Sequence, residues 1–132
     1  MSPSWLPATP ADFESFVALR SVTRTLWDVP TTEFWFVDGP RYIGTLMIRH
    51  SLTPQLRREG GHIGYHVVPA HRRRGHATAM LAGACAYCRT CGMKEVLVTC
   101  IDSNIGSRRV IEVNGGVLED IVAGTCLYWI TL

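Results

Sequence analysis

The chain has 132 residues, of which 47% are hydrophobic and 18% are charged, and its formal net charge is +2. This composition excludes a disordered chain, and the charge is too low for a dedicated nucleic-acid-binding domain, whose basic residues would spread over a whole face. We therefore expect one folded domain over residues 1–132.

Two further classes of protein are also excluded by the sequence. No apolar run approaches the ~20 residues that a membrane-spanning helix needs. The N-terminus has no basic leader followed by an apolar block, so we expect no secretory signal. Five cysteines, an odd number, then suggest reduced thiols and a cytoplasmic location.

The first half of the chain predicts one helix and two strands. Residues 1–10 carry three prolines and should be extended, and Asp12 is a suitable N-cap for a helix over residues 13–27. Residues 33–37 are aromatic and typical of a strand, and the turn Asp38-Gly39-Pro40 joins them to a hairpin partner over residues 42–50. A polar, basic loop over residues 51–61 follows.

The second half predicts three strands around two helices, then a last strand. The strands cover residues 62–68, 95–100, 117–121 and 126–132, and the helices cover residues 75–91 and 105–113. The first of these helices carries its apolar residues at helical spacing and should end at Gly92. This order of elements predicts an α/β (α+β) fold with a mixed, mostly antiparallel central sheet flanked by helices.

Three consecutive arginines precede the helix predicted over residues 75–91. A helix N-terminus offers unpaired N–H groups and a partial positive charge, so it binds anions. Gly75 and Ala77 leave the backbone open to an approaching phosphate, and the arginines add charge and forked donors. A solvated loop and a nucleic-acid site are the alternatives. The local clustering favours a pyrophosphate site, with no nucleic acid and no membrane as partner.

These residues resemble the acetyl-coenzyme A motif of the GNAT acetyltransferase superfamily, Gln/Arg-x-x-Gly-x-Gly/Ala, with Arg72, Gly75 and Ala77 at the matching positions. The segments GTLMIRH, GGHIGYHVVP and VLVTCIDSNIGSRRVIEVNGG fit the strands and helix around that motif. The likeness covers roughly residues 32–119, and together the segments resemble predicted GNAT acetyltransferases.

The resemblance implies acetyl-CoA as cosubstrate and assigns residues to bind it. The pyrophosphate would lie on the backbone amides from Arg73 to Thr78. The residues of that cradle are Arg72, Arg73, Arg74, Gly75, His76, Ala77 and Thr78. Pantetheine would pair with the backbone from Tyr65 to Val67, in a cleft where a bulge separates the family's fourth strand from its fifth. The amide of Tyr65 or His66 would polarise the thioester carbonyl, and Asn104 and Ser107 would contact the cofactor from the other side.

Candidate catalytic residues follow from the chemistry of acyl transfer to an amine. His62 and His66 are candidate general bases, since imidazole exchanges protons near neutral pH, and Glu33 is a further candidate. Either histidine could instead be a packed or a surface residue. Their spacing places both on one face of an ideal strand, whereas a bulge would turn them apart.

The sequence does not identify the general acid. Many members of the family carry a tyrosine several residues after the asparagine, and the segment after Asn104 has none. The thiolate then leaves unassisted, or Tyr128 serves, or catalysis is weak.

Three other features of the sequence can be explained without a functional role. Cys85-x-x-Cys88-x-x-Cys91 has part of an iron–sulfur spacing, but it lies on the predicted helix stripe, so we expect buried thiols and no metal. Arg57 and Arg58 could line an acceptor site and favour an anionic group, but a solvated loop is the simpler explanation and the one we expect. The aromatic set Trp27, Phe34, Trp35 and Phe36 could form a ligand cage, but we expect it to pack in the core and within the hairpin.

The leading hypothesis is an N-acetyltransferase that moves an acetyl group from acetyl-CoA directly to a primary amine. The alternative is a catalytically weak CoA- or acyl-CoA-binding module. The resemblance also implies that the N-terminus is shortened, because one more strand should precede residues 33–37. That strand would be absent or rebuilt from residues 4–8. An exposed sheet edge promotes association, so we expect a homodimer.

Overall fold

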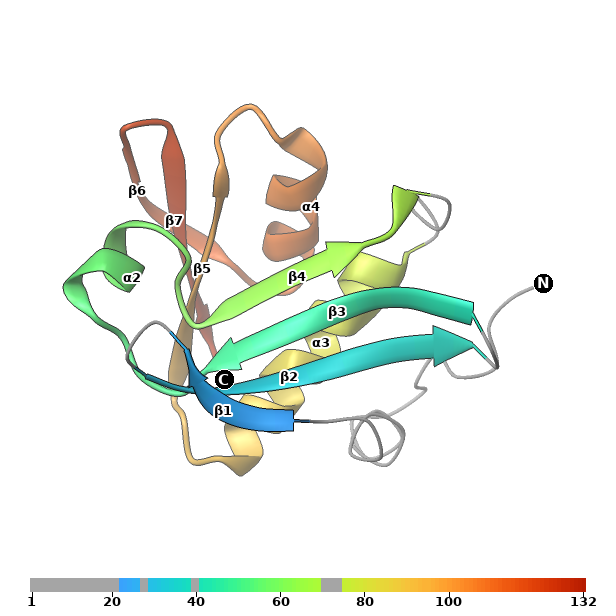
Figure 1. Ribbon diagram of the computed structural model, residues 1–132. Coiled ribbons are helices and arrows are strands. Elements are labelled where there is room, and N and C mark those ends of the chain that lie inside the picture. The colour runs from blue at the N-terminus through green and yellow to red at the C-terminus, as the bar shows by residue number, and fades with distance from the viewer. Residues whose placement is uncertain (1–21, 27–28, 39–40, 70–74) are drawn as a thin grey trace.

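The structure, a computed structural model, describes residues 22–26, 29–38, 41–69 and 75–132, and the account below concerns those residues. They form a seven-stranded sheet in the order β1-β2-β3-β4-β5-β7-β6 (Figure 1). The strands are β1 (Val22–Leu26), β2 (Val29–Asp38), β3 (Arg41–Arg49), β4 (Ile63–Val67), β5 (Glu95–Ile101), β6 (Val117–Val122) and β7 (Thr125–Thr131), and the helices are α2 (Pro54–Arg58), α3 (His76–Thr90) and α4 (Ile105–Val113).

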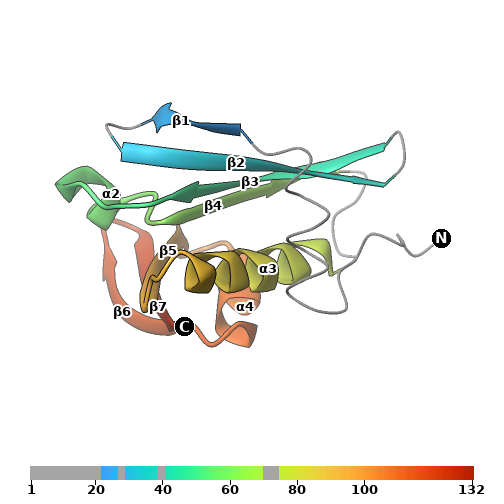
Figure 2. The same cartoon turned by 90° about the horizontal axis from the view of Figure 1, so that it is seen from below.

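Strand pairing confirms the predicted mixed, mostly antiparallel sheet. Successive strands from β1 to β4 pair antiparallel, as do β5 with β7 and β7 with β6. Only the contact of β4 with β5 is parallel, because α3 crosses over between them. Figure 2 shows α3 and α4 on the same side of the sheet.

The core lies between the sheet and α3. On α3 the buried residues include Met80, Leu81, Ala84, Cys85 and Cys88, so the apolar stripe predicted from helical spacing is confirmed. They pack against alternate residues of β2 and β3, which point to the same face of the sheet. Phe34 and Tyr87 meet edge to face there, with ring centroids 4.9 Å apart.

Local signals set the bounds of the two main helices. Gly75, at φ 80°, precedes α3, and Gly92, at φ 83°, follows it. Both φ angles lie in the left-handed region, which glycine adopts without strain and which is common just after the end of a helix. Asn104 caps α4, and its side chain accepts a hydrogen bond from the Ser107 N–H at 3.1 Å. Both helices therefore start and end within one residue of their predicted bounds.

The N-terminal predictions need correction. Residues 22–26 were expected to end a helix, but they form β1, which pairs with β2 from Val22 opposite Glu33 to Leu26 opposite Val29. Val22, Thr23 and Thr25 are β-branched, and an adjacent strand offers them a ladder that a helix end does not. The outer strand that was expected to be missing is therefore present. The rest of the predicted helix, residues 1–10 and the suggested strand at residues 4–8 lie outside the described residues.

The loop predicted over residues 51–61 contains α2. Thr53 caps it by accepting a hydrogen bond from the Leu56 N–H at 3.2 Å, and Pro54 occupies its first position. Leu56 is buried, whereas Arg57 and Arg58 are exposed. No described helix has the length and apolar character that crossing a bilayer requires.

Candidate functional site: a cleft between diverging strands

The central feature of the site is the divergence of β4 from β5. These strands share a single paired position, Ile63 opposite Val98, and then separate in a V (Figure 1). Gly61 allows the close contact at the apex, because a Cβ there would collide with the Leu97 carbonyl oxygen. The expected bulge is not found in β4, whose register with β3 runs unbroken from Ile63 to Val67. The strands therefore separate without one.

A cavity of about 240 Å³ lies in this opening. Its walls come from β3, β4, β5, the segment before β4 and the start of α4. The lining residues are Arg49, Gly60, Ile63, Gly64, Tyr65, Thr99, Cys100, Ile101, Asn104 and Ser107. Of the residues predicted to bind the cofactor, the structure thus brings Tyr65, Asn104 and Ser107 together around one space.

The backbone of β4 turns polar groups toward the cavity. The Arg49 N–H donates to the His62 carbonyl at 2.6 Å, and the Val68 N–H donates to the Ile43 carbonyl at 2.9 Å. In an antiparallel pair these bonds recur at every second residue, so His66 also directs its polar groups toward β3. Tyr65 and Val67, at the intervening positions, direct theirs toward the cleft. Of the two amides predicted to polarise a carbonyl, that of Tyr65 therefore faces the cleft and that of His66 does not.

The first turn of α3 supplies further backbone donors. Gly75 has no side chain to cap the helix, and the first intrahelical bond runs from the Ala79 N–H to the Gly75 carbonyl at 3.1 Å. The amides of Ala77 and Thr78 therefore have no acceptor within the helix. The His76 side chain is buried. Arg72, Arg73 and Arg74 lie outside the described residues.

The end of α4 is tied to this turn. The Asn114 side-chain N–H donates to the Thr78 carbonyl at 3.3 Å and to the Val110 carbonyl at 2.9 Å. Asn114 therefore links α4, whose start lines the cavity, to the first turn of α3. Figure 1 draws α4 between the diverging strands, on the side of the sheet where Figure 2 places α3.

Residues 2–117 match the family model described as acetyltransferase (GNAT) domain. The chain belongs to the GNAT acetyltransferase family.

Solved structures agree with this assignment at the level of the fold. The GNAT domain of S. lividans PAT has 18% identity and a TM-score of 0.65, covering 77% of this chain and 61% of its own. Mycobacterium smegmatis RimJ, solved with CoA-disulfide, has 25% identity and a TM-score of 0.64, covering 79% of this chain and 54% of its own. Spermidine N-acetyltransferase from Vibrio cholerae, solved with CoA and spermine, has 17% identity and a TM-score of 0.62, covering 76% of this chain and 65% of its own.

This GNAT chain is short beside those relatives, since it spans 54% to 65% of the length of the three solved chains. Curated protein sequences gave no match.

His62, one of the two candidate bases of this GNAT chain, is bonded into the apex of the V. Its Nδ1 accepts a hydrogen bond from the Leu97 N–H at 2.9 Å, and its own backbone N–H donates to the Leu97 carbonyl at 2.7 Å. Burial, with the charges of Arg57 and His50, lowers the pKa of His62 to about 4. A neutral imidazole has one acceptor nitrogen, and here it is occupied. This arrangement argues for a structural role, and the catalytic role of His62 stays a prediction.

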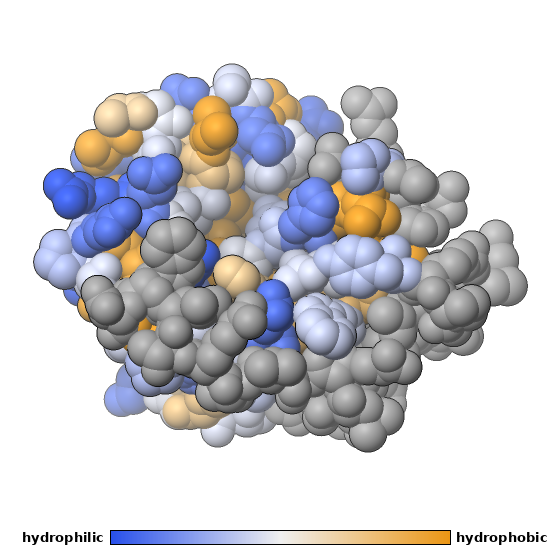
Figure 3. Space-filling model, in the orientation of Figure 1, coloured by the Kyte–Doolittle hydropathy of each residue, from blue (hydrophilic) through white to orange (hydrophobic). Residues whose placement is uncertain are grey.

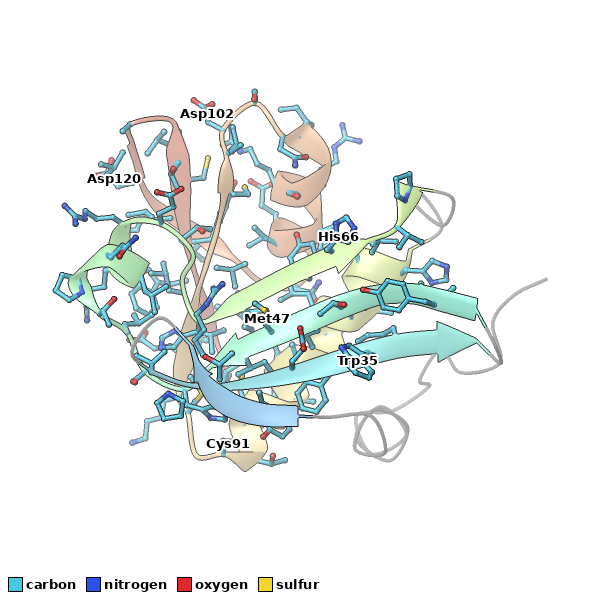
Figure 4. All side chains as sticks on the ribbon, viewed as in Figure 1. Trp35, Met47, His66, Cys91, Asp102 and Asp120 are labelled. Atoms are coloured by element: carbon cyan, nitrogen blue, oxygen red, sulfur yellow. The ribbon has the colours of Figure 1, made fainter. Side chains whose placement is uncertain are left out.

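His66 lies on the exposed face of β4. Strand register places it beside Thr45, which is beside Trp35, and Figure 4 shows Trp35, Met47 and His66 on three neighbouring strands. Glu33 shares this face, since it is two residues from Trp35. The two remaining candidate bases therefore lie on one side of the sheet, opposite the helices.

Tyr128, the alternative general acid, is fully engaged away from the cavity. Its hydroxyl donates to a Glu112 carboxylate oxygen at 2.8 Å and accepts from the Arg108 Nε–H at 3.0 Å. Burial raises the pKa of Tyr128, and the Arg108 bond partly offsets this. Tyr128 is not among the cavity residues, so nothing in its geometry supports the role of acid.

The cysteines of α3 behave as core residues. Cys85 and Cys88 are buried, and burial raises the pKa of their thiols to about 11 and about 12. Within the described parts of the chain, no three His, Cys, Asp or Glu side chains cluster so that they could hold a metal ion. The interpretation of this motif as a helix face is confirmed for these two residues.

Sequence reasoning missed several cavity residues, and Arg49 is the most informative. It is only 8% exposed, and its Nη1 donates to the carbonyls of Gly60 and Gly61 at 2.9 and 3.1 Å. A lone arginine at the end of an apolar strand was a signal that could have found it. Thr99 and Cys100 carry no such signal, because they reach the cavity only through the divergence of the strands.

Proposed function

We propose that this protein is an N-acetyltransferase that transfers an acetyl group from acetyl-CoA directly to a primary amine. The single observation that supports this most is the divergence of β4 and β5 after one paired position, with a cavity between them. A parallel pair that separates so early leaves a strand edge unpaired, and an extended ligand can use that edge. The acetyl donor, the amine acceptor and a cytoplasmic location are all parts of this proposal.

The geometry supports the following roles for the chain's residues. The pyrophosphate would bind at the first turn of α3, on the amides from His76 to Thr78, assisted by the preceding arginines. Pantetheine would pair with the cleft-facing backbone of Tyr65 and Val67. The Tyr65 amide would donate to the thioester oxygen as negative charge develops there.

The amine would approach from the exposed face of the sheet, where His66 and Glu33 lie. A base on that face would take the proton that nitrogen loses as it bonds to the carbonyl carbon. His66 is on β4 itself, whereas Glu33 is two strands away at a spacing of about 4.8 Å per strand, so His66 is the base that we propose.

A second function deserves a test, because α4 carries no tyrosine. It is binding of CoA or acyl-CoA with little catalysis. Isothermal titration with acetyl-CoA tests both functions, and absence of binding at millimolar concentration would eliminate them together. A thiol-release assay over a panel of amines then separates them, since only an enzyme produces CoA at a steady rate that depends on the amine.

A further inference from the structure

Tyr65 lines the cavity between β4 and β5, and its buried hydroxyl makes no hydrogen bond of good geometry. The Tyr65 Oη is shielded from solvent, and no described group lies in hydrogen-bonding geometry with it. A buried hydroxyl without a partner loses about 1–3 kcal/mol of hydrogen bonding that water would supply. Groups of this kind call for an explanation, and a bound ligand is one.

Tyr65 also has the right position within the strand. Its backbone polar groups face the cleft, as the register with β3 requires, while its side chain shares the face of Ile63 and Val67 against the helices. His66 projects from the opposite face. The cleft thus has a titratable group on each side of the sheet, and a thioester held between the strands would lie between them.

The surroundings of the phenol keep it protonated. Burial raises the pKa of Tyr65, and Cys100 on β5 raises it further. The Ser107 hydroxyl on α4, which is close by but outside hydrogen-bonding geometry, partly offsets this rise. Arg49 on β3 is the charged side chain of the cavity lining, and Asn104 and Ser107 of α4 are neutral. The Cys100 thiol is itself protonated, because burial raises its pKa to about 11.

We propose that Tyr65 is the general acid of the acetyl transfer, in place of a tyrosine on α4. This rests on the proposed function. The amine nitrogen bonds to the carbonyl carbon and yields its proton to the base. The carbon–sulfur bond breaks, its electron pair goes to sulfur, and sulfur takes the proton of the Tyr65 hydroxyl. The products are the acetylated amine and CoA. Solvent takes the proton from the base and returns a proton to the tyrosinate.

The experiment measures the pKa of the thiol of bound CoA from its thiolate absorbance, as the difference between the complexes with CoA and with desulfo-CoA. A phenol that donates to sulfur stabilises the thiolate. Tyr65→Phe should therefore raise the pKa of the bound thiol by about one unit or more, while the affinity for CoA changes less than about threefold. Tyr128→Phe, which removes the other candidate hydroxyl, should leave the pKa of that thiol unchanged.

Turnover supplies the second readout. With acetyl-CoA and an accepted amine, Tyr65→Phe should lower kcat by about 10²-fold, and an acetyl thioester of an acidic thiol should recover most of that loss, since its leaving group needs no proton. If CoA binds and Tyr65→Phe leaves the pKa of the bound thiol unchanged, or if Tyr128→Phe shifts it instead, the assignment of Tyr65 is wrong while the proposed function stands. If CoA does not bind the wild-type protein, both fall.

Discussion

The imidazole of His62 illustrates how one buried side chain can tie stability to pH. Its pKa falls from 6.5 to about 4 on folding because burial disfavours the charged ring. Between these values the unfolded chain binds a proton that the folded chain does not. Stability is therefore full above pH 6.5 and is lost as the pH falls toward 4.

We predict that lowering the pH from 7 to 5 costs the wild-type protein about 2 kcal/mol through this one residue. In His62→Asn the amide oxygen can replace Nδ1 as acceptor for the Leu97 N–H, and it does not titrate. Urea unfolding at both pH values measures the free energy of unfolding for the two proteins. The variant should be less sensitive to pH by that amount, and equal sensitivity would contradict the low pKa of His62.

Gly44 on β3 is a second residue whose identity is set by a single contact. A Cβ at this position would collide with the carbonyl oxygen of His66 on β4. Gly44→Ala should therefore lower the free energy of unfolding by about 1–3 kcal/mol, since the two strands must move apart. Gly106→Ala on α4 is the matched control. Its Cβ would meet its nearest atom at 3.7 Å, so this variant should be neutral or up to about 1 kcal/mol more stable in the same urea titration.

Matched substitutions at the two ends of α3 can test the proposed anion site. Gly75 and Gly92 have φ of 80° and 83°, and a Cβ at either would meet nothing within 4 Å. Valine at either position should cost about 1–3 kcal/mol of stability through backbone strain. Only at Gly75 would the side chain also keep a phosphate from the amides of the first turn.

Gly75→Val should therefore weaken acetyl-CoA binding at least about tenfold in isothermal titration, which corresponds to about 1.4 kcal/mol. Gly92→Val should bind as the wild type does. Equal affinities for the two variants would show that the first turn of α3 is not the anion site, whatever their stabilities.

At the scale of the whole molecule, the edge strand β6 is open to association with another chain. All six residues of β6 are exposed, and this strand forms one edge of the sheet. Four of the six are large and apolar, namely Val117, Leu118, Ile121 and Val122. Figure 3 shows apolar residues on the surface over the β6–β7 hairpin. The homodimer predicted from the sequence thus stays a prediction, and β6 is the edge that we now expect it to use.

Light scattering at micromolar concentration should give about twice the 14.7 kDa mass of one chain. The double change Ile121→Lys with Val122→Lys should give the mass of a monomer, because charge on an edge strand opposes pairing. Val113→Lys, which alters an exposed valine on α4 instead, should leave the dimer intact. A monomer mass for the wild-type protein would rule this association out.

Elements with a local code were predictable from the amino-acid order. The 3.6-residue apolar period located α3, Gly75 and Gly92 marked its ends, and the asparagine cap placed the start of α4. The prediction of an anion site at the first turn of α3 rests on the same kind of local code, since a helix N-terminus leaves amides without intrahelical acceptors in any surroundings. The strands β3, β5 and β7 were likewise found within about one residue of their bounds.

Features that depend on residues far apart in the chain could not be read in this way. His62 and Leu97 are 35 positions apart, and nothing in the sequence of either segment predicts their hydrogen bond. The assignment of residues 22–26 depends on whether β2 is available as a neighbour, and a run of β-branched residues fits a strand there better than a helix. The separation of β4 from β5, the cavity it opens and the burial of the Tyr65 hydroxyl arise from packing between segments, so they exist only once the chain has folded.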